Sequence, residues 1–246
     1  MRLLLFLLCA TSMTPISSLA SHCDRVDLRA VEATICTIDT ERDRLELFLR
    51  DESGAPFKFF SALQRHLERS ERHLVLAMNA GMYHGNFDPV GLLVIDGVEI
   101  APLNLQSAAG NFFLKPNGVF ALTASGPRIV ESSLYPSLQN VELATQSGPL
   151  LVIDGALHPA FRKESTSKYV RNGVGILNEH TVLLAITEQP VTLYDFAMFF
   201  RDGLGCKDAL YLDGGVSSLY SAALQRKDVR AALGPILAIT EVSRGE

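Results

Sequence analysis

The chain contains the same tight-turn signal twice. LLVIDGVEI at 92–100 and LLVIDGALH at 150–158 each place Asp-Gly between strand-like residues. Asp-Gly in that setting favours a two-residue turn whose twist matches that of two antiparallel strands. We therefore expect two hairpins, and with them an antiparallel sheet.

Strand-like segments continue through most of the chain, recognised by alternating or buried apolar residues. Residues 73–81 (HLVLAMNAG) predict a buried strand, and residues 112–123 (FFLKPNGVFALT) predict two strand-like flanks around a turn at 115–118. Residues 31–39 and 44–50 predict one further hairpin, and residues 171–187 another that turns at 178–180.

Two segments, residues 59–70 and 190–205, have helical periodicity. In the second, Thr192 is expected to cap the helix, and Asp195 stands three residues later, as in a capping box. Many strands, two or three helices and no strand–helix–strand repeats predict an α+β fold. We expect a single domain built on a mixed, mostly antiparallel sheet.

The first 20 residues, MRLLLFLLCATSMTPISSLA, have the features of a signal peptide. Arg2 precedes an apolar run, and Ser18-Leu19-Ala20 forms a small-x-small cleavage site. The apolar run is too short to cross a bilayer, which takes about 20 residues. We expect cleavage after Ala20, export to the periplasm or beyond, no membrane span, and one domain over residues 21–246.

Three cysteines follow the predicted leader: Cys23, Cys36 and Cys206. An oxidising compartment permits a disulfide, and Cys23–Cys36 is the pair nearest in sequence. Closing that loop would contribute about 3 kcal/mol in the chain-entropy model. A Cys36–Cys206 pair is the alternative.

The formal net charge is −5, so the chain lacks the basic footprint of a nucleic-acid-binding protein. A phosphate-bearing ligand would need a local group of cationic side chains. The sequence leaves the oligomeric state open.

A third Asp-Gly, in ALYLDGGVSSLY at 209–220, does not fit a hairpin. Asp213 is followed by two glycines and then, after Val216, by two serines, where a hairpin would return in large apolar residues. Positive φ angles at the glycines would let the backbone approach a ligand closely. Hydroxyl and N–H groups would then gather around one carboxylate, as at an anion or sugar site. A glycine bulge with a capping aspartate is the alternative.

Four other loops combine polar residues with glycine at the end of an apolar strand. They lie at residues 78–89, 114–118, 145–149 and 169–175. We expect these loops and the Asp213 segment to gather on one side of the sheet as a polar pocket.

NAGMYH, FFLKPNGVF, QSGPLLV, RNGVG, PVTLYDFA and YLDGGVSSLY occur in that order. Together, over about residues 74–241, they resemble the phosphodiester glycosidase family, most closely a bacterial periplasmic branch. The resemblance implies hydrolysis of a glycosyl-1-phosphodiester to free sugar and a phosphomonoester, in envelope or exopolysaccharide metabolism. Val216 and the Arg171-Asn172-Gly173 sequence depart from the vertebrate pattern and leave the sugar open.

Arg171 and Asp213 are the predicted catalytic residues. A guanidinium binds two phosphate oxygens in a fork, and a carboxylate can act as nucleophile or base, or can hold a divalent cation. A divalent cation near Asp213 is therefore an open alternative, and no other cofactor is expected. The predicted substrate-binding residues are Asn79, Gly81, His84, Asn117, Gln146, Ser147, Asn172, Gly214, Gly215, Ser217 and Ser218.

Glycosidases usually use two carboxylates, and Asp88 and Glu188 are candidates for the second. Because a phosphate leaving group is a weak base, the demand for a general acid is relaxed. Two rival functions are a non-catalytic phosphosugar- or saccharide-binding protein and a metal-dependent phosphodiesterase. No clustered Asp and His motif supports the second rival.

Overall fold

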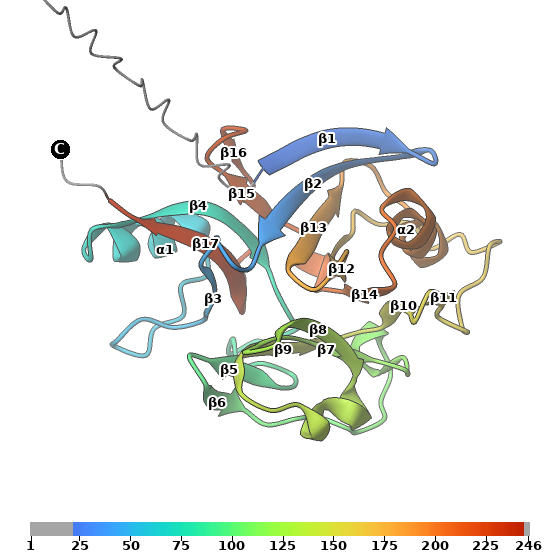
Figure 1. Cartoon of the computed structure of the whole chain (residues 1–246), viewed down its shortest axis with the longest axis horizontal. Helices are drawn as coiled ribbons and strands as arrows, with labels where there is room; N and C mark the ends of the chain where they lie inside the picture. The colour runs from blue at the N-terminus through green and yellow to red at the C-terminus, as the bar shows by residue number, and fades with distance from the viewer. Residues whose placement is uncertain (1–21, 244–246) are drawn as a thin grey trace, which may run out of the picture.

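Strands in the computed structural model, which describes residues 22–243, form three sheets (Figure 1). In spatial order, the seven-stranded sheet consists of β1 (His22–Leu28), β2 (Val31–Asp39), β13 (Thr181–Thr187), β12 (Asn172–Ile176), β14 (Asp208–Tyr211), β10 (Leu150–Ile153) and β11 (Ala156–Leu157). One five-stranded sheet consists of β16 (Arg226–Lys227), β15 (Leu219–Ser221), β4 (Arg72–Asn79), β17 (Ile236–Val242) and β3 (Leu45–Phe48). The other consists of β6 (Val98–Ala101), β5 (Leu93–Ile95), β9 (Val141–Ser147), β7 (Gly118–Thr123) and β8 (Gly126–Glu131).

Two α-helices accompany the sheets at the predicted places, α1 (Phe60–Glu68) and α2 (Leu193–Met198), and α2 continues as a wider π turn to Gly203. The Thr192 hydroxyl caps α2 by accepting from the Asp195 N–H at 3.0 Å. The predicted α+β class with mostly antiparallel strands is confirmed, with the strands divided among three sheets. Within residues 22–243, no helix has the length and apolarity needed to cross a membrane. The predicted signal peptide lies outside the described residues.

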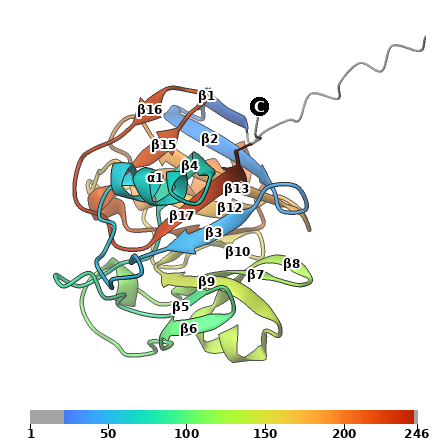
Figure 2. The same cartoon turned by 90° about the vertical axis from the view of Figure 1, so that its left-hand side faces the viewer.

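The inner faces of the three sheets share one apolar core. Ile38 of β2, Met78 of β4 and Phe120 of β7 are all fully buried in it, although they come from three different sheets. Helix α2 covers the outer face of the seven-stranded sheet, and α1 covers the outer face of the β4–β17 sheet (Figures 1 and 2). Strands in these positions are buried on both faces, which explains why several read as continuous apolar runs.

Both predicted Asp-Gly hairpins are confirmed. Strands β5 and β6 flank Asp96-Gly97, with φ angles of 49° and 76°, and β10 and β11 flank Asp154-Gly155, with φ angles of 47° and 77°. Positive φ at both central residues is the type I′ geometry that Asp-Gly favours. The predicted hairpin over 171–187 is also confirmed, because β12 pairs with β13.

Two predictions about the strands are wrong. Strand β2 pairs with β1 and β13, whereas β3 pairs with β17 in another sheet, so the segments at 31–39 and 44–50 form no hairpin. A turn in which the Asp43 N–H donates to the Asp39 carbonyl at 2.7 Å leads the chain from one sheet to the other. The segment before Lys115 contains a 3₁₀ turn, η1 (Asn111–Phe113), in place of a strand. Alternation of apolar and polar residues indicates a strand, but it does not determine which other strand that strand pairs with.

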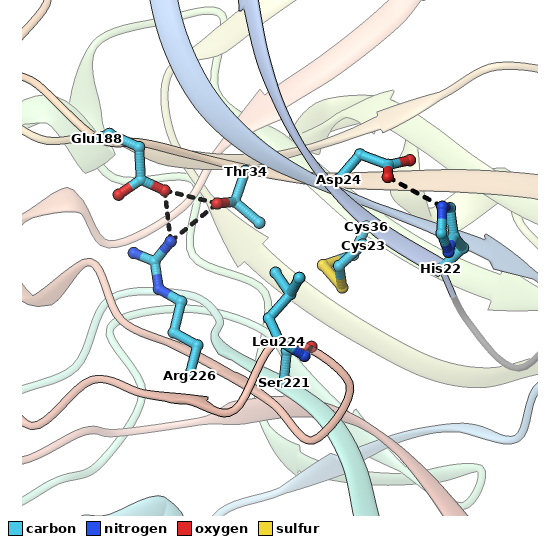
Figure 3. Close-up of a disulfide and its surroundings, with 9 residues drawn as sticks. All are labelled: His22, Cys23, Asp24, Thr34, Cys36, Glu188, Ser221, Leu224 and Arg226. Atoms are coloured by element: carbon cyan, nitrogen blue, oxygen red, sulfur yellow. Dashed lines mark hydrogen bonds and ion pairs between the residues drawn. A yellow bond between two sulfur atoms is a disulfide. The ribbon is translucent and has the colours of Figure 1, made fainter.

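Cys23 and Cys36 form a disulfide (Figure 3), which confirms the prediction that the two cysteines nearest in sequence pair. The two residues stand directly opposite each other on β1 and β2, with 4.1 Å between their Cα atoms. Cys206 is reduced and buried, and burial raises the pKa of its thiol to about 12. The alternative Cys36–Cys206 pair is therefore excluded.

Candidate functional site

The third Asp-Gly lies where the chain passes between two sheets. Strand β14 of the seven-stranded sheet ends at Tyr211, and β15 of the β4–β17 sheet begins at Leu219. Between them, Asp213 has a φ angle of −71° and caps a 3₁₀ turn, η4 (Gly214–Val216). This segment is not a hairpin turn, as the residues after Asp213 indicate.

The two glycines serve a different purpose from the one predicted. Neither Gly214 nor Gly215 has a positive φ angle, so the expectation of left-handed backbone is wrong. A Cβ atom on Gly214 would lie 1.7 Å from the hydroxyl oxygen of Tyr211, whose side chain is buried. A Cβ atom on the exposed Gly215 would lie 3.2 Å from the nearest Asp213 carboxylate oxygen. Gly214 therefore makes room for a buried phenol.

The Asp213 carboxylate is half-buried and has one hydrogen bond from the protein. Its Oδ1 accepts from the Gly215 N–H at 3.1 Å, and its own N–H donates to the Ala80 carbonyl at 3.0 Å. Burial raises the pKa of Asp213 above its ordinary value, and the Gly215 bond opposes part of that rise. Among residues 22–243, no basic side chain lies within 4.0 Å of this carboxylate.

Arg171 is the largest of the fully buried side chains, with 1% of its surface exposed. Its Nε donates to the Val191 carbonyl at 2.8 Å, Nη1 to the Tyr211 hydroxyl at 3.0 Å, and Nη2 to the Ser167 carbonyl at 3.0 Å. The guanidinium lies over the rings of Tyr169 and Tyr211, at 5.5 and 5.3 Å from their centres. Within the described part of the chain, no carboxylate lies within 4.0 Å of it. A guanidinium has five N–H donors, so two remain free for an anion.

Tyr211 joins the two predicted catalytic residues, and sequence reasoning missed it. Its hydroxyl accepts from Arg171. Burial raises the pKa of Tyr211, the charge of Arg171 lowers it, and the charge of Asp213 raises it again, so both charges lie close to the phenol. Tyr211 is the last residue of β14, and Asp213 follows two residues later at the start of η4. The closeness of Tyr211 to Asp213 along the chain was the signal available in the sequence.

Four predicted substrate-binding residues come together in one hydrogen-bonded network. Asn172 Nδ2 donates to Asn79 Oδ1 at 3.1 Å, the Ser218 N–H donates to the same oxygen at 2.9 Å, and the Ser217 hydroxyl donates to Asn172 Oδ1 at 2.9 Å. Asn79 Nδ2 donates to the Asp213 carbonyl at 2.7 Å. These buried bonds fix the backbone that presents Asp213, and direct contact of the four side chains with a substrate stays a prediction.

The side chains of Gln146 and Asn117 are used within the protein. Gln146 accepts from the backbone N–H groups of Leu92 and Asn104 at 3.0 and 2.9 Å, and it donates to the Asn104 carbonyl at 2.7 Å. Asn117 donates to the Phe112 carbonyl at 2.8 Å. Both residues stabilise the loops of the β5–β9 sheet, and their contact with a substrate stays a prediction.

Gly81, Ser147 and His84 occupy three different environments. The Gly81 N–H donates to the Thr145 hydroxyl at 3.1 Å, which joins the loop after β4 to the end of β9. The Ser147 hydroxyl is buried without a hydrogen-bond partner in the described part of the chain. His84 is exposed, and its ring makes no hydrogen bond with residues 22–243. Their contact with a substrate stays a prediction.

Neither candidate for a second carboxylate joins Asp213. Asp88 pairs with Arg50 at 2.9 Å on the surface. Glu188 pairs with Arg226 and accepts from the Thr34 hydroxyl, in a cluster close to the disulfide (Figure 3). Both carboxylates are already paired with a cation, so Asp213 is the one of the three candidate carboxylates without a basic partner among residues 22–243.

A divalent cation was the remaining alternative for Asp213. No three side chains of the His, Cys, Asp and Glu type come together as a metal site anywhere within residues 22–243. A divalent cation usually takes several oxygen ligands, so the single carboxylate of Asp213 does not fit a dedicated metal site. No step is assigned to a metal.

Replacing Gly214 with alanine is expected to lower the free energy of unfolding by about 2 kcal/mol, because the added methyl group overlaps Tyr211 in a packed interior. The Tyr211 ring cannot yield easily, since it is buried and bonded to Arg171. Urea denaturation measures the change. Gly215→Ala is the matched control and is expected to stay within about 0.5 kcal/mol of wild type. Equal losses in the two variants would contradict this account of Gly214.

Comparison with known proteins covers most of the chain. The family model described as phosphodiester glycosidase matches residues 72–237, which include Arg171 and Asp213. A protein of Escherichia coli (strain K12), "Uncharacterized protein YigE", is 31% identical over 184 residues, covering 75% of this chain and 72% of the relative.

Solved structures share the fold at low sequence identity. The catalytic domain of zebrafish N-acetylglucosamine-1-phosphodiester α-N-acetylglucosaminidase, auto-inhibited by its pro-peptide, superposes with a TM-score of 0.60 at 14% identity, covering 89% of this chain and 82% of that one. A hypothetical protein from Synechocystis superposes with a TM-score of 0.56 at 12% identity, covering 89% of this chain and 61% of that one.

Proposed function

The chain belongs to the phosphodiester glycosidase family, and from that premise we propose that it hydrolyses a glycosyl-1-phosphodiester to free sugar and a phosphomonoester. One observation carries the proposal. The Arg171 guanidinium is buried, has no carboxylate partner within residues 22–243, and keeps two N–H donors free. A buried charge is costly unless an opposite charge balances it. The single negative charge of a phosphodiester would supply that balance.

The residues around Arg171 suit cleavage at the sugar carbon. The bond between C1 and the phosphate oxygen breaks, and its electron pair leaves with the phosphate, whose charge Arg171 and the Tyr211 hydroxyl stabilise. The oxygen of a water molecule forms the new bond to C1. Asp213 accepts the proton that this water releases and later passes it to solvent. Because the departing phosphate is a weak base, one free carboxylate is sufficient.

The pH dependence of the reaction tests the role of Asp213. Asp213 acts as a base only when ionised, and burial raises its pKa above the ordinary value of 3.8. We expect kcat/KM to rise with pH through a midpoint above 3.8. Initial rates measured between about pH 3 and about pH 7 give the midpoint. A midpoint at or below the ordinary carboxyl value would contradict the role of Asp213 as the base.

The reaction itself can be tested with UDP-N-acetylglucosamine and purified protein, in water enriched in heavy oxygen. Cleavage at C1 places the heavy oxygen in free N-acetylglucosamine and leaves UDP unlabelled. Cleavage at phosphorus places it in a phosphate product and, if it is abolished by a chelator, favours the metal-dependent phosphodiesterase. Tight binding without turnover would favour a phosphosugar-binding protein.

Export and a role in envelope or exopolysaccharide metabolism belong to the same proposal. The Cys23–Cys36 disulfide supports export, because disulfides persist mainly in oxidising compartments. Cell fractionation with an antibody tests the location, and recovery of the protein in the cytosolic fraction would refute export.

A further inference from the structure

The guanidinium of Arg171 is closed off from solvent. Only 1% of the surface of this side chain is exposed, although two of its N–H donors have no acceptor within residues 22–243. Two of the groups that contact it belong to exposed residues. The Ser167 carbonyl accepts from Nη2 at 3.0 Å, and the centre of the Tyr169 ring lies 5.5 Å from Cζ of Arg171. A phosphate can reach Arg171 from solvent only if groups that cover the guanidinium move.

Ser167 belongs to a strap of polar residues, RKESTSK at 162–168. The strap lies outside any helix or strand, and its residues are exposed apart from Ser165, which is half-buried. It contains no apolar side chain that could be buried in the core. In the described part of the chain, one hydrogen bond joins the strap to other residues, the bond from Arg171 Nη2 to the Ser167 carbonyl. A segment with so few contacts costs little free energy to open.

The residues on either side of the strap are firmly held. Before it, the Phe161 ring stacks on the buried ring of His158, with 4.7 Å between the centres. After it, Tyr169 and Val191 exchange backbone hydrogen bonds of 3.1 and 2.9 Å. Between these two ends, the strap lines two cavities, of about 520 and about 490 Å³, which Tyr194 of α2 also lines. The strap therefore has room to shift while both of its ends stay in place.

The Ser167 carbonyl and a phosphate compete for the same N–H donors. The carbonyl is a neutral acceptor that takes one hydrogen bond from Arg171, whereas a phosphate is charged and can take two parallel bonds in a fork. Replacing the carbonyl leaves both N–H groups of Nη2 to the phosphate. The exposed Tyr169 ring can turn aside about its own side-chain bonds, without breaking its backbone pair with Val191. Loss of the Arg171 bond then releases the strap.

We infer that the strap is a gate over Arg171, and that the phosphate group of the ligand opens it by taking the place of the Ser167 carbonyl. The inference rests on the proposed function, because it takes Arg171 as the phosphate position. In the closed state, the carbonyl is a stand-in acceptor for the buried charge. The free protein exchanges between closed and open states, and a ligand that binds only the open state increases the population of that state.

Limited digestion with trypsin, followed by mass spectrometry, measures how often the gate opens. The strap supplies its own cleavage sites, after Arg162, Lys163 and Lys168. Inorganic phosphate is the probe, and sodium chloride of the same ionic strength is its control. We expect saturating phosphate to speed cleavage in the wild-type strap about tenfold, as the loss of one hydrogen bond to a charged group would. Cleavage after Arg69, an exposed residue at the end of α1, is expected to stay unchanged.

The variant Arg171→Met removes the same hydrogen bond without any ligand. Cleavage in the strap is expected to rise about tenfold and to lose its dependence on phosphate, while cleavage after Arg69 keeps its wild-type rate. Arg65→Met is the matched control, because it removes an exposed charge of the same type from α1. It is expected to leave strap cleavage, with and without phosphate, as in wild type.

The outcomes separate the gate from the proposed hydrolysis. Phosphate that slows strap cleavage in wild type, or leaves it unchanged, would overturn the gate. An equal rise in cleavage after Arg69 in Arg171→Met would show that Arg171 holds the whole fold rather than the strap, and would also overturn it. Strap cleavage that depends on phosphate, with no sugar release from UDP-N-acetylglucosamine, would refute the hydrolysis and leave the gate in place. Sugar release with strap cleavage indifferent to phosphate would do the reverse.

Discussion

Replacing Arg171 with methionine is expected to lower kcat/KM by about 10³-fold, because the charge that stabilises the departing phosphate is lost. The same change is expected to shift the free energy of unfolding by only about 1 kcal/mol. A buried charge is often replaced by an apolar side chain of similar size without loss of stability. Hydrolysis rates and urea denaturation, measured on the same preparations, check both parts.

The contacts of Arg171 explain why the Arg171→Met variant is expected to keep most of its stability. The Val191 carbonyl also accepts from the Tyr169 N–H at 3.1 Å, so it keeps a partner in the variant. The Ser167 carbonyl belongs to an exposed residue and can bond to water. Only the Tyr211 hydroxyl is left without its donor.

A structural role for Arg171 would give a different result. Removing one partner of a buried charge network that serves only the fold costs about 3–5 kcal/mol. A loss of that size in Arg171→Met would contradict the proposal, whatever the rate. Arg171→Lys is the matched control: it retains the charge without the planar fork, and we expect it to keep part of the activity.

Replacing Asp213 with asparagine is expected to lower kcat/KM by about 10³-fold, because the amide cannot accept the proton of the attacking water. Asparagine keeps the Oδ1 acceptor for the Gly215 N–H, which anchors the side chain at 3.1 Å. The fold around the site is therefore expected to remain intact. Steady-state rates with a sugar-1-phosphodiester measure the loss, and Asp27→Asn, an exposed change on β1, is expected to leave the rate unchanged.

The same substitution is expected to leave the protein as stable as wild type or more stable. Burial raises the pKa of Asp213 in the folded state, so its ionised form lowers stability at every pH above that raised pKa. The cost is absent below the unfolded pKa, where the carboxyl is protonated in both states. Thermal unfolding at about pH 7 should show no fall in Tm. A clear fall in Tm would mean that the carboxylate stabilises the fold, which contradicts its assignment as a half-buried base whose ionised form lowers stability.

Local sequence predicts those features of this protein that depend on residues close together along the chain. Each Asp-Gly turn depends on the φ angles of two adjacent residues, and the cap of α2 depends on a contact between Thr192 and Asp195. The disulfide joins two residues on adjacent strands of one hairpin. The choice of Asp213 as the carboxylate to test also came from its immediate neighbours.

The tertiary structure decided which strands pair and which polar groups remain free, because both depend on contacts between distant segments. Strands β2 and β3 are close in sequence yet belong to different sheets. Gln146 and Asn117 are predicted from the sequence to bind a substrate, and the structure adds that both side chains also hydrogen-bond backbone groups of the protein, at Leu92 and Phe112. Arg171 differs from these two residues. Its guanidinium donates to Ser167, Val191 and Tyr211, and the fold buries its charge with no carboxylate partner in the described part of the chain.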